Sequence, residues 1–252
     1  SPQAVLLPGF VNIHTHLELT VLRGYLEGLD FFSWIRALTR AKYAVLNQED
    51  LLVSSLLGAI VAVRAGITTV ADPMDIGASL DAVLATGLRA VLYQEVFSPK
   101  PSEAEQALQC LMSKIKSLES RLSRWPEEAL LQAKTSNASA DVTSRQQRVT
   151  LGVSPHAVFT VSAPLFAKTS SFALEHNYPV CIHAAESESE TQLTKDGTGP
   201  MMESLRQRGI DWTPSHISPI AYLHALGILN RRTLLVHCIR LEPSDYAILR
   251  DQ

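Results

Sequence analysis

Residues 7–16 read Leu-Pro-Gly-Phe-Val-Asn-Ile-His-Thr-His, which is a turn, then a short apolar strand, then two histidines one residue apart. Side chains alternate between the two faces of a strand, so His14 and His16 are predicted to project from the same side. Two imidazoles on one face can chelate a divalent cation such as zinc. A solvent-facing pair at a strand end is the alternative, and the rest of the chain has to decide between them.

The chain has 252 residues, of which 46% are hydrophobic and 19% charged, and its formal net charge is −3. This length suits one large domain, since α/β barrels of this size are common. The slightly acidic balance, without a basic block, predicts no nucleic-acid binding. The longest apolar run, at 51–63, is too short to span a bilayer. Three widely separated cysteines without a C-x-x-C pair are typical of reduced thiols and predict a cytoplasmic protein.

Six short apolar segments alternate with helical patterns, which predicts βα units on a parallel sheet. One strand is predicted at 67–71, ended by Asp72-Pro73. One helix is predicted at 102–124, with a second beginning at Trp125-Pro126, and residues 134–148 are predicted to form a polar loop.

Polar residues follow the predicted strands, and reactive groups of parallel sheets collect at the carboxyl ends of strands. These residues are His14 with His16, Asp72, Glu95, His156, His183 and His237. Four of the six strands end in histidine, which a chance placement of eight histidines would rarely produce. The pattern therefore favours a metal site, although a lone histidine at a strand end is more often structural.

The segment His-Ala-Ala-Glu at 183–186 brings a candidate third ligand and a carboxylate to one strand end. A cation held by three histidines lowers the pKa of bound water toward about 7. Glu186 then suits the role of proton shuttle, and His237 could orient the hydroxide or stabilise developing charge. Glu18 and Glu95 lie near predicted strand ends and are candidate substrate contacts.

Four motifs together resemble the amidohydrolase superfamily: PGFVNIHTH at 8–16, SPHA at 154–157, HAAE at 183–186 and VHC at 236–238. They are most similar to the branch of deaminases that use a single metal ion. This branch includes S-adenosylhomocysteine, methylthioadenosine, guanine and aminodeoxyfutalosine deaminases. The motifs occur in order over nearly the whole chain, and their combination is specific, whereas each alone is a weak signal.

The resemblance implies an α/β fold of the (β/α)8 TIM-barrel type. It implies that the metal ligands are His14, His16 and His183. It also implies that Glu186 is the proton shuttle and that His237 contacts the metal-bound water.

In the purine deaminases of this family, the histidine that matches His156 contacts the substrate base. The Ser-Pro-His turn at 154–156 stands where members with two metals have a lysine ligand, so the resemblance implies one divalent ion, with zinc expected and iron the alternative. The expected partners are a small-molecule substrate and, in the full-length parent, further copies of the chain, with no nucleic acid and no membrane.

Two departures from the family pattern concern the ends of the chain. Members usually begin with strands of a small β-sandwich, and their last metal ligand is an aspartate after the eighth strand, whereas six strands are counted here. Asp245 and Asp251 lie in or beside the last predicted helix and should not substitute for that ligand. Residues 1–252 are therefore expected to form a partial barrel of about six βα units, without the β-sandwich strands and the last two βα units.

The function expected from these residues is hydrolytic deamination of an aminated purine or nucleoside-like substrate. A metal-bound hydroxide would attack the amino-bearing carbon and release ammonia. The alternatives are hydrolysis of a cyclic amide or chloro-triazine by the same chemistry, and a catalytically incomplete fragment or pseudoenzyme.

Overall fold

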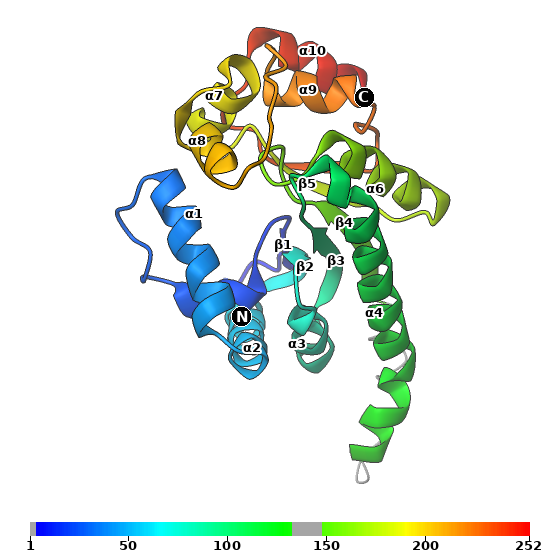
Figure 1. Cartoon of the computed structure of the whole chain (residues 1–252). Helices are drawn as coiled ribbons and strands as arrows, with labels where there is room; N and C mark the ends of the chain where they lie inside the picture. The colour runs from blue at the N-terminus through cyan, green and yellow to red at the C-terminus, as the bar shows by residue number, and fades with distance from the viewer. Residues whose placement is uncertain (1–3, 133–147) are drawn as a thin grey trace. The chain divides into compact units, whose positions relative to one another are not determined.

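The computed structural model describes residues 4–132 and 148–252 (Figure 1). Its strands are β1 (Phe10–Asn12), β2 (Ile67–Met74), β3 (Arg89–Val96), β4 (Val149–Pro155), β5 (Val180–Ala184) and β6 (Thr233–His237). They form one sheet in which the spatial order equals the chain order, β1-β2-β3-β4-β5-β6. The pairings of β1 with β2, β4 with β5 and β5 with β6 are parallel, which confirms the predicted α/β class with six strands.

Helices separate the strands along the chain. The α-helices are α1 (Phe31–Arg40), α2 (Gln48–Arg64), α3 (Ala78–Thr86), α4 (Ala104–Gln132), α6 (Ala163–Glu175), α7 (Glu188–Asp196), α8 (Gly199–Gln207), α9 (Pro219–Ala225) and α10 (Pro243–Asp251). The described residues also form two 3-10 helices, η1 (Leu17–Leu22) and η3 (Pro101–Glu103), and one π-helix, η2 (Ala41–Val45). Within the described part of the chain, no helix combines the length and the apolar character needed to cross a membrane.

The chain divides into two compact units. Unit 1 comprises described residues within 1–23, 46–92 and 118–150, and unit 2 comprises residues 24–45, 93–117 and 151–252.

In unit 1, local sequence signals account for the ends of α2. Asn47 caps the helix by accepting hydrogen bonds from the backbone N–H groups of Glu49 and Asp50, and the Asp50 side chain accepts from the Asn47 N–H in return. The helix ends before Gly66, whose φ of 81° is the left-handed conformation that glycine adopts without strain. These bounds agree with the sequence pattern.

Two predicted boundaries at prolines are wrong. β2 continues through Asp72-Pro73 to Met74, because the fixed φ of proline is compatible with an extended chain. α4 continues through Trp125-Pro126 as one helix to Gln132, since a proline removes one helical hydrogen bond without always ending the helix. The polar loop predicted at 134–148 lies, apart from its last residue, outside the described residues.

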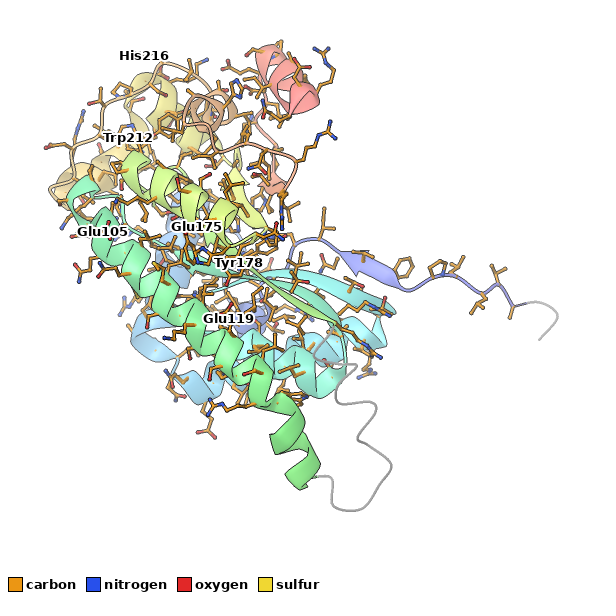
Figure 2. The ribbon with its side chains drawn as sticks, turned by 90° about the vertical axis from the view of Figure 1, so that its right-hand side faces the viewer. Glu105, Glu119, Glu175, Tyr178, Trp212 and His216 are labelled. Atoms are coloured by element: carbon orange, nitrogen blue, oxygen red, sulfur yellow. The ribbon has the colours of Figure 1, made fainter. Side chains whose placement is uncertain are left out.

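In unit 2, side chains of neighbouring elements join the helices to one another. Figure 2 marks Glu105 at the start of α4, and its carboxylate lies 2.7 Å from Nζ of Lys168 on α6. Figure 2 also marks Trp212 and His216 in the segment after α8. The Trp212 indole N–H donates to the carbonyl of Leu193 at 3.1 Å, and His216 Nδ1 contacts the carbonyl of Lys195 at 2.8 Å. Both contacts tie this segment to α7.

Glycine at position 152 permits close packing of β4. A Cβ atom there would lie 2.7 Å from the carbonyl oxygen of Pro179 and 2.7 Å from Cδ1 of Tyr93. Carbon and oxygen atoms cannot approach so closely without displacing one of the neighbours. β4 and β5 pair beside this point, with Val153 opposite Val180.

We therefore expect Gly152→Ala to destabilise the chain by about 1–3 kcal/mol, as overpacking of a well-packed core does. The measurement is urea denaturation at constant pH. Thr150→Ala, at an exposed position of the same strand, is the matched control and should change stability by less than about 0.5 kcal/mol. Equal midpoints for wild type and Gly152→Ala would contradict the packing described here.

Candidate active site

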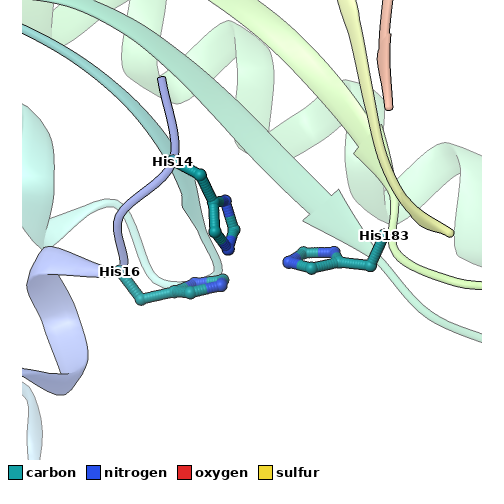
Figure 3. A group of neighbouring side chains, drawn as sticks. All are labelled: His14, His16 and His183. Carbon is teal, nitrogen blue, oxygen red and sulfur yellow. The ribbon is translucent and has the colours of Figure 1, made fainter. Parts of the chain in front are cut away.

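In unit 1, His14 and His16 lie on the segment between β1 and η1 (Figure 3). Their rings meet edge to face, with centroids 4.8 Å apart. His16 Nδ1 lies 3.0 Å from the main-chain carbonyl oxygen of Pro73. A carbonyl can only accept, so Nδ1 carries the proton and Nε2 is the unprotonated nitrogen of the ring. A histidine in this tautomer can coordinate a metal through Nε2.

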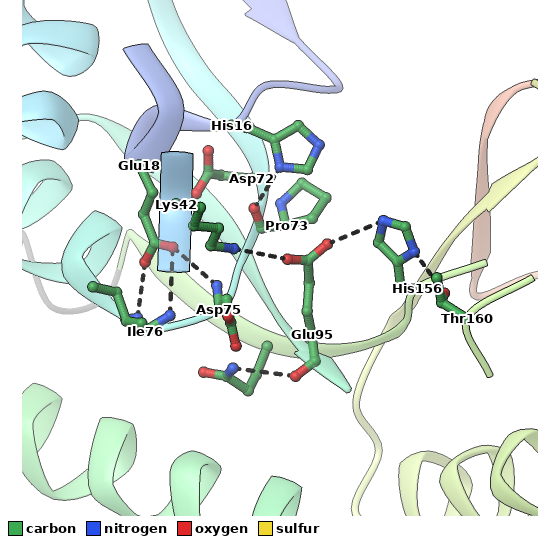
Figure 4. Close-up of polar contacts among 12 residues, drawn as sticks. His16, Glu18, Lys42, Asp72, Pro73, Asp75, Ile76, Glu95, His156 and Thr160 are labelled. Carbon is green, nitrogen blue, oxygen red and sulfur yellow. Dashed lines mark hydrogen bonds and ion pairs between the residues drawn. The ribbon is translucent and has the colours of Figure 1, made fainter. Parts of the chain in front are cut away.

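Two buried carboxylates hold this segment in place (Figure 4). Asp72 Oδ1 accepts the backbone N–H of Leu17 at 2.7 Å. Glu18 is 2% exposed, and its two oxygens lie 2.9–3.4 Å from four backbone nitrogens. The four N–H donors belong to Asp75, Ile76, Gly77 and Ala78. Glu18 thus caps the start of α3, and its predicted contact with substrate stays a prediction beside this structural role.

In unit 2, three strand ends bring Glu95, His156 and His183 together. One possible ligand atom from each lies within 4.8 Å of the other two, so this set of nitrogen and oxygen donors could hold a metal ion. Glu95 and His183 are 4% and 3% exposed. Sequence analysis placed all three at strand ends, and the structure confirms that they are neighbours.

Each member of this cluster is oriented by a second contact. His183 Nδ1 lies 3.2 Å from the carbonyl oxygen of His156, so Nδ1 carries the proton and Nε2 is the unprotonated nitrogen. His156 Nδ1 lies 2.8 Å from the Thr160 hydroxyl oxygen, and its Nε2 lies 3.9 Å from Glu95 Oε1 (Figure 4). The hydrogen bonds to Nδ1 therefore fix the rotation of both rings.

Lys42 is a charged neighbour of the cluster that sequence analysis missed. Its side chain is 7% exposed, and its ammonium nitrogen lies 3.9 Å from Glu95 Oε2. Burial removes the hydration of both charges, which costs free energy. The attraction between the ammonium and the carboxylate offsets part of that cost. The sequence carried no signal for this pair, since a lysine within a helical pattern normally faces solvent.

Glu186 and His237 form a second pair in unit 2. His237 Nε2 lies 3.4 Å from Glu186 Oε1. Burial, together with the nearby charge of Glu190, raises the pKa of Glu186 to about 7. Burial also lowers the pKa of His237. Near neutral pH the carboxyl group is therefore close to half protonated beside a neutral imidazole, which suits a group that must accept and return a proton.

Glu190, which was not singled out from the sequence, holds the backbone at Glu186 in place. It is fully buried, and its two oxygens accept the backbone N–H groups of Ala185 at 3.0 Å and Glu186 at 2.8 Å. Burial raises the pKa of Glu190 to about 7, against the effect of these hydrogen bonds. The available signal was the Ser-x-x-Glu spacing at 187–190, which is typical of a helix start.

The backbone beside the Glu186–His237 pair is strained. Ala185, His237 and Cys238 have φ values of 52°, 75° and 50°, in the left-handed region that non-glycine residues seldom adopt. Hydrogen bonds between the two strand ends hold this conformation: the Cys238 N–H donates to Ala184 and the Ile239 N–H to Ala185. Such strain is concentrated at functional sites. No glycine or asparagine in the sequence indicated it.

Comparisons with known proteins give one family. The family model described as "Amidohydrolase family" matches residues 5–252. A 5-methylthioadenosine/S-adenosylhomocysteine deaminase of Nitratidesulfovibrio vulgaris is 28% identical over 252 residues, which is 99% of this chain and 48% of the relative. An aminodeoxyfutalosine deaminase of Deinococcus radiodurans is 29% identical, over 97% of this chain and 54% of the relative. The chain thus spans about half the length of the curated relatives it matches.

Among solved structures, an adenosine deaminase from Xanthomonas campestris with bound zinc aligns with a TM-score of 0.65 and 21% identity. The alignment covers 97% of this chain and 47% of that one. This likeness concerns the fold, and it supports the predicted incomplete barrel type.

The contacts of Glu18 predict a stability effect. In Glu18→Gln the amide NH2 group would face backbone N–H donors, which leaves at least one of them without an acceptor. We expect a loss of about 1–3 kcal/mol in the free energy of unfolding, measured by urea denaturation. The control is Glu49→Gln, an exposed position in the first turn of α2, with a change below about 0.5 kcal/mol. If the two variants are equally stable, Glu18 does not anchor α3.

The raised pKa values of Glu186 and Glu190 predict how stability depends on pH. In the unfolded chain these carboxyl groups ionise near their ordinary value of 4.5, whereas in the folded chain they keep protons up to about pH 7. The folded state binds more protons over this interval, so the free energy of unfolding of the metal-free chain should fall as pH rises from 4.5 to about 7.

Urea denaturation across that interval measures the slope. Glu190→Gln removes one of the two groups and should flatten the fall, whereas Glu188→Gln, whose side chain is 59% exposed, should leave it unchanged. A slope that Glu190→Gln does not alter would show that Glu190 ionises normally in the folded chain.

Proposed function

This chain belongs to the amidohydrolase family, and we propose that it acts as part of a metal-dependent hydrolytic deaminase of aminated purines or similar nucleosides. The observation that carries the proposal is the Glu186–His237 pair: a carboxyl group with a pKa of about 7 that lies 3.4 Å from a neutral imidazole. Deamination needs a group that takes a proton from water and returns one to the leaving amine. The deaminase names of the curated relatives agree with this chemistry.

We propose His14, His16 and His183 as ligands of a divalent ion. The donor chemistry fits, because Nδ1 of both His16 and His183 lies against a backbone carbonyl and Nε2 is the nitrogen able to coordinate. Imidazole ligands suit zinc and iron, and zinc is the ion we propose. When bound, such an ion supplies Lewis acidity that lowers the pKa of water.

Proton transfer, positioning and substrate contact are the roles proposed for the other side chains of the site. Glu186 would take a proton from the attacking water and give one to the leaving amino group, which departs as ammonia, since a pKa of about 7 allows both steps near neutral pH. His237, neutral and next to Glu186, holds that carboxyl in position. His156, whose ring is fixed by Thr160, would contact the base of the substrate, and Glu95 would be a further contact, held by Lys42.

The alternatives are less well supported. Hydrolysis of a cyclic amide or a chloro-triazine would use the same residues, but the curated relatives described above are named as deaminases. The remaining alternative, an inactive fragment or pseudoenzyme, would release no ammonia, and the measurement below tests it. Assembly into a homo-oligomer and a cytoplasmic location stay predictions.

The decisive variant is Glu186→Gln in the full-length protein. Ammonia release from adenosine-like substrates should fall by about 10²–10⁴-fold, the range for loss of a general acid–base group, while the content of bound metal stays the same. Glu188→Gln, exposed and 3.8 Å from Arg240, is the matched control and should keep full activity. Ammonia release that survives in Glu186→Gln at a similar rate would remove Glu186 from the proposed role.

A further inference from the structure

Glu95, His156 and His183 form a set of possible metal ligands that lies entirely within unit 2. Each contributes one possible ligand atom, and these atoms lie within 4.8 Å of one another. In the proposed catalytic site, His183 coordinates together with His14 and His16 of unit 1, and Glu95 and His156 contact substrate. The set in unit 2 therefore shares one residue with the catalytic ligands and uses no residue of unit 1.

The hydrogen bonds of the Thr160 hydroxyl group identify the acceptor nitrogen of His156. The hydroxyl donates its only proton to the carbonyl oxygen of Ala157 at 3.1 Å. It therefore accepts from His156 Nδ1, 2.8 Å away, so in the neutral ring Nε2 carries the lone pair. This Nε2 lies 3.9 Å from Glu95 Oε1 (Figure 4). Two acceptor atoms thus face each other.

His183 adds a third acceptor to the pair. Its Nδ1 lies against the carbonyl oxygen of His156, so its Nε2 is the unprotonated nitrogen. Acceptors that face one another repel, and a cation between them turns that repulsion into attraction, most strongly where burial excludes water. Glu95 and His183 are both buried. Two imidazoles and one carboxylate are also a donor set that zinc uses in enzymes.

The spacing of the acceptors is close to what a zinc ion needs. Ligand atoms around a tetrahedral zinc ion lie about 3.3–3.4 Å apart, because its bonds to nitrogen and oxygen are about 2.0–2.1 Å long. The distance of 3.9 Å between His156 Nε2 and Glu95 Oε1 would therefore shorten by about 0.5 Å on binding. Small rotations of the two side chains supply a change of this size.

Lys42 determines how the Glu95 carboxylate is presented. Its ammonium nitrogen lies 3.9 Å from Oε2, whereas Oε1 is the oxygen that faces His156. The carboxylate therefore offers one oxygen to an ion, and the ammonium on its other side repels a divalent cation. Lys42 should thus weaken metal binding by this set without occupying it.

We propose that Glu95, His156 and His183 form a second position for a divalent ion, which excludes both the catalytic ion and the substrate. Imidazole Nε2 has one lone pair and coordinates one ion, so His183 cannot serve both positions at once. An ion in the second position also occupies Glu95 and His156, and the enzyme in this state is inactive. The ion position rests on the geometry of unit 2, and only the competition with substrate rests on the proposed function.

Zinc binding by the full-length protein without His14 and His16 tests the second position. In metal-free His14→Ala/His16→Ala, titration calorimetry should still show one bound zinc ion. Adding Glu95→Gln or His156→Gln should weaken this binding by about tenfold or more, because one of three ligands is lost. Adding Glu188→Gln, whose side chain is 59% exposed, is the control and should change nothing. A double variant that binds no zinc, or zinc binding that neither Glu95→Gln nor His156→Gln weakens, overturns the inference.

Lys42→Met in the same double variant gives a readout that loss of the fold cannot imitate. Removal of the ammonium next to Glu95 should tighten zinc binding by about tenfold, since one repulsive charge is gone. An affinity that does not increase would place the ion away from Glu95.

Adenosine added to the double variant tests the competition with substrate. If adenosine and zinc both use Glu95 and His156, saturating adenosine should raise the apparent Kd of zinc by about tenfold or more. Adenosine that binds without changing the zinc affinity would overturn the competition. If adenosine does not bind although zinc binding depends on Glu95, the proposed function fails and the second ion position stands.

Discussion

Hydrogen bonds between main-chain carbonyl groups and histidine Nδ1 atoms determine which ring nitrogen of two histidines is able to bind a cation. His16 contacts the carbonyl of Pro73, and His183 that of His156. A carbonyl oxygen has no proton to give, so each bond fixes the tautomer in which Nε2 is the nitrogen that can coordinate a cation. Pro73 lies at the end of β2, and His156 directly follows β4. The sheet therefore fixes the positions of the carbonyl groups that set the tautomers of these two histidines.

Carboxylates in unlike surroundings then take unlike roles. Glu18 accepts four backbone N–H groups and stabilises a helix start, and Glu95 faces the ammonium of Lys42. Burial, together with the nearby charge of Glu190, raises the pKa of Glu186 to about 7. The same type of side chain is structural in η1 and able to exchange protons after β5 because its neighbours differ.

The sequence predicted the strands and the residues at their ends well, because period and cap signals are local. The six strands in chain order and the meeting of Glu95, His156 and His183 at strand ends are examples. Boundaries at Pro73 and Pro126 were wrong, since tertiary packing tolerates prolines that local rules treat as stops. The roles of Lys42 and Glu190 depend on burial and on partners distant in sequence, which a single sequence does not reveal.

The central claim is that histidine nitrogens of this chain coordinate a divalent metal ion, and X-ray absorption spectroscopy of the zinc-loaded full-length protein tests it most directly. The account predicts a shell of imidazole nitrogens at about 2.0–2.1 Å that loses intensity in His16→Ala and in His183→Ala. A sulfur shell at about 2.3 Å, or a spectrum that neither substitution alters, would contradict it.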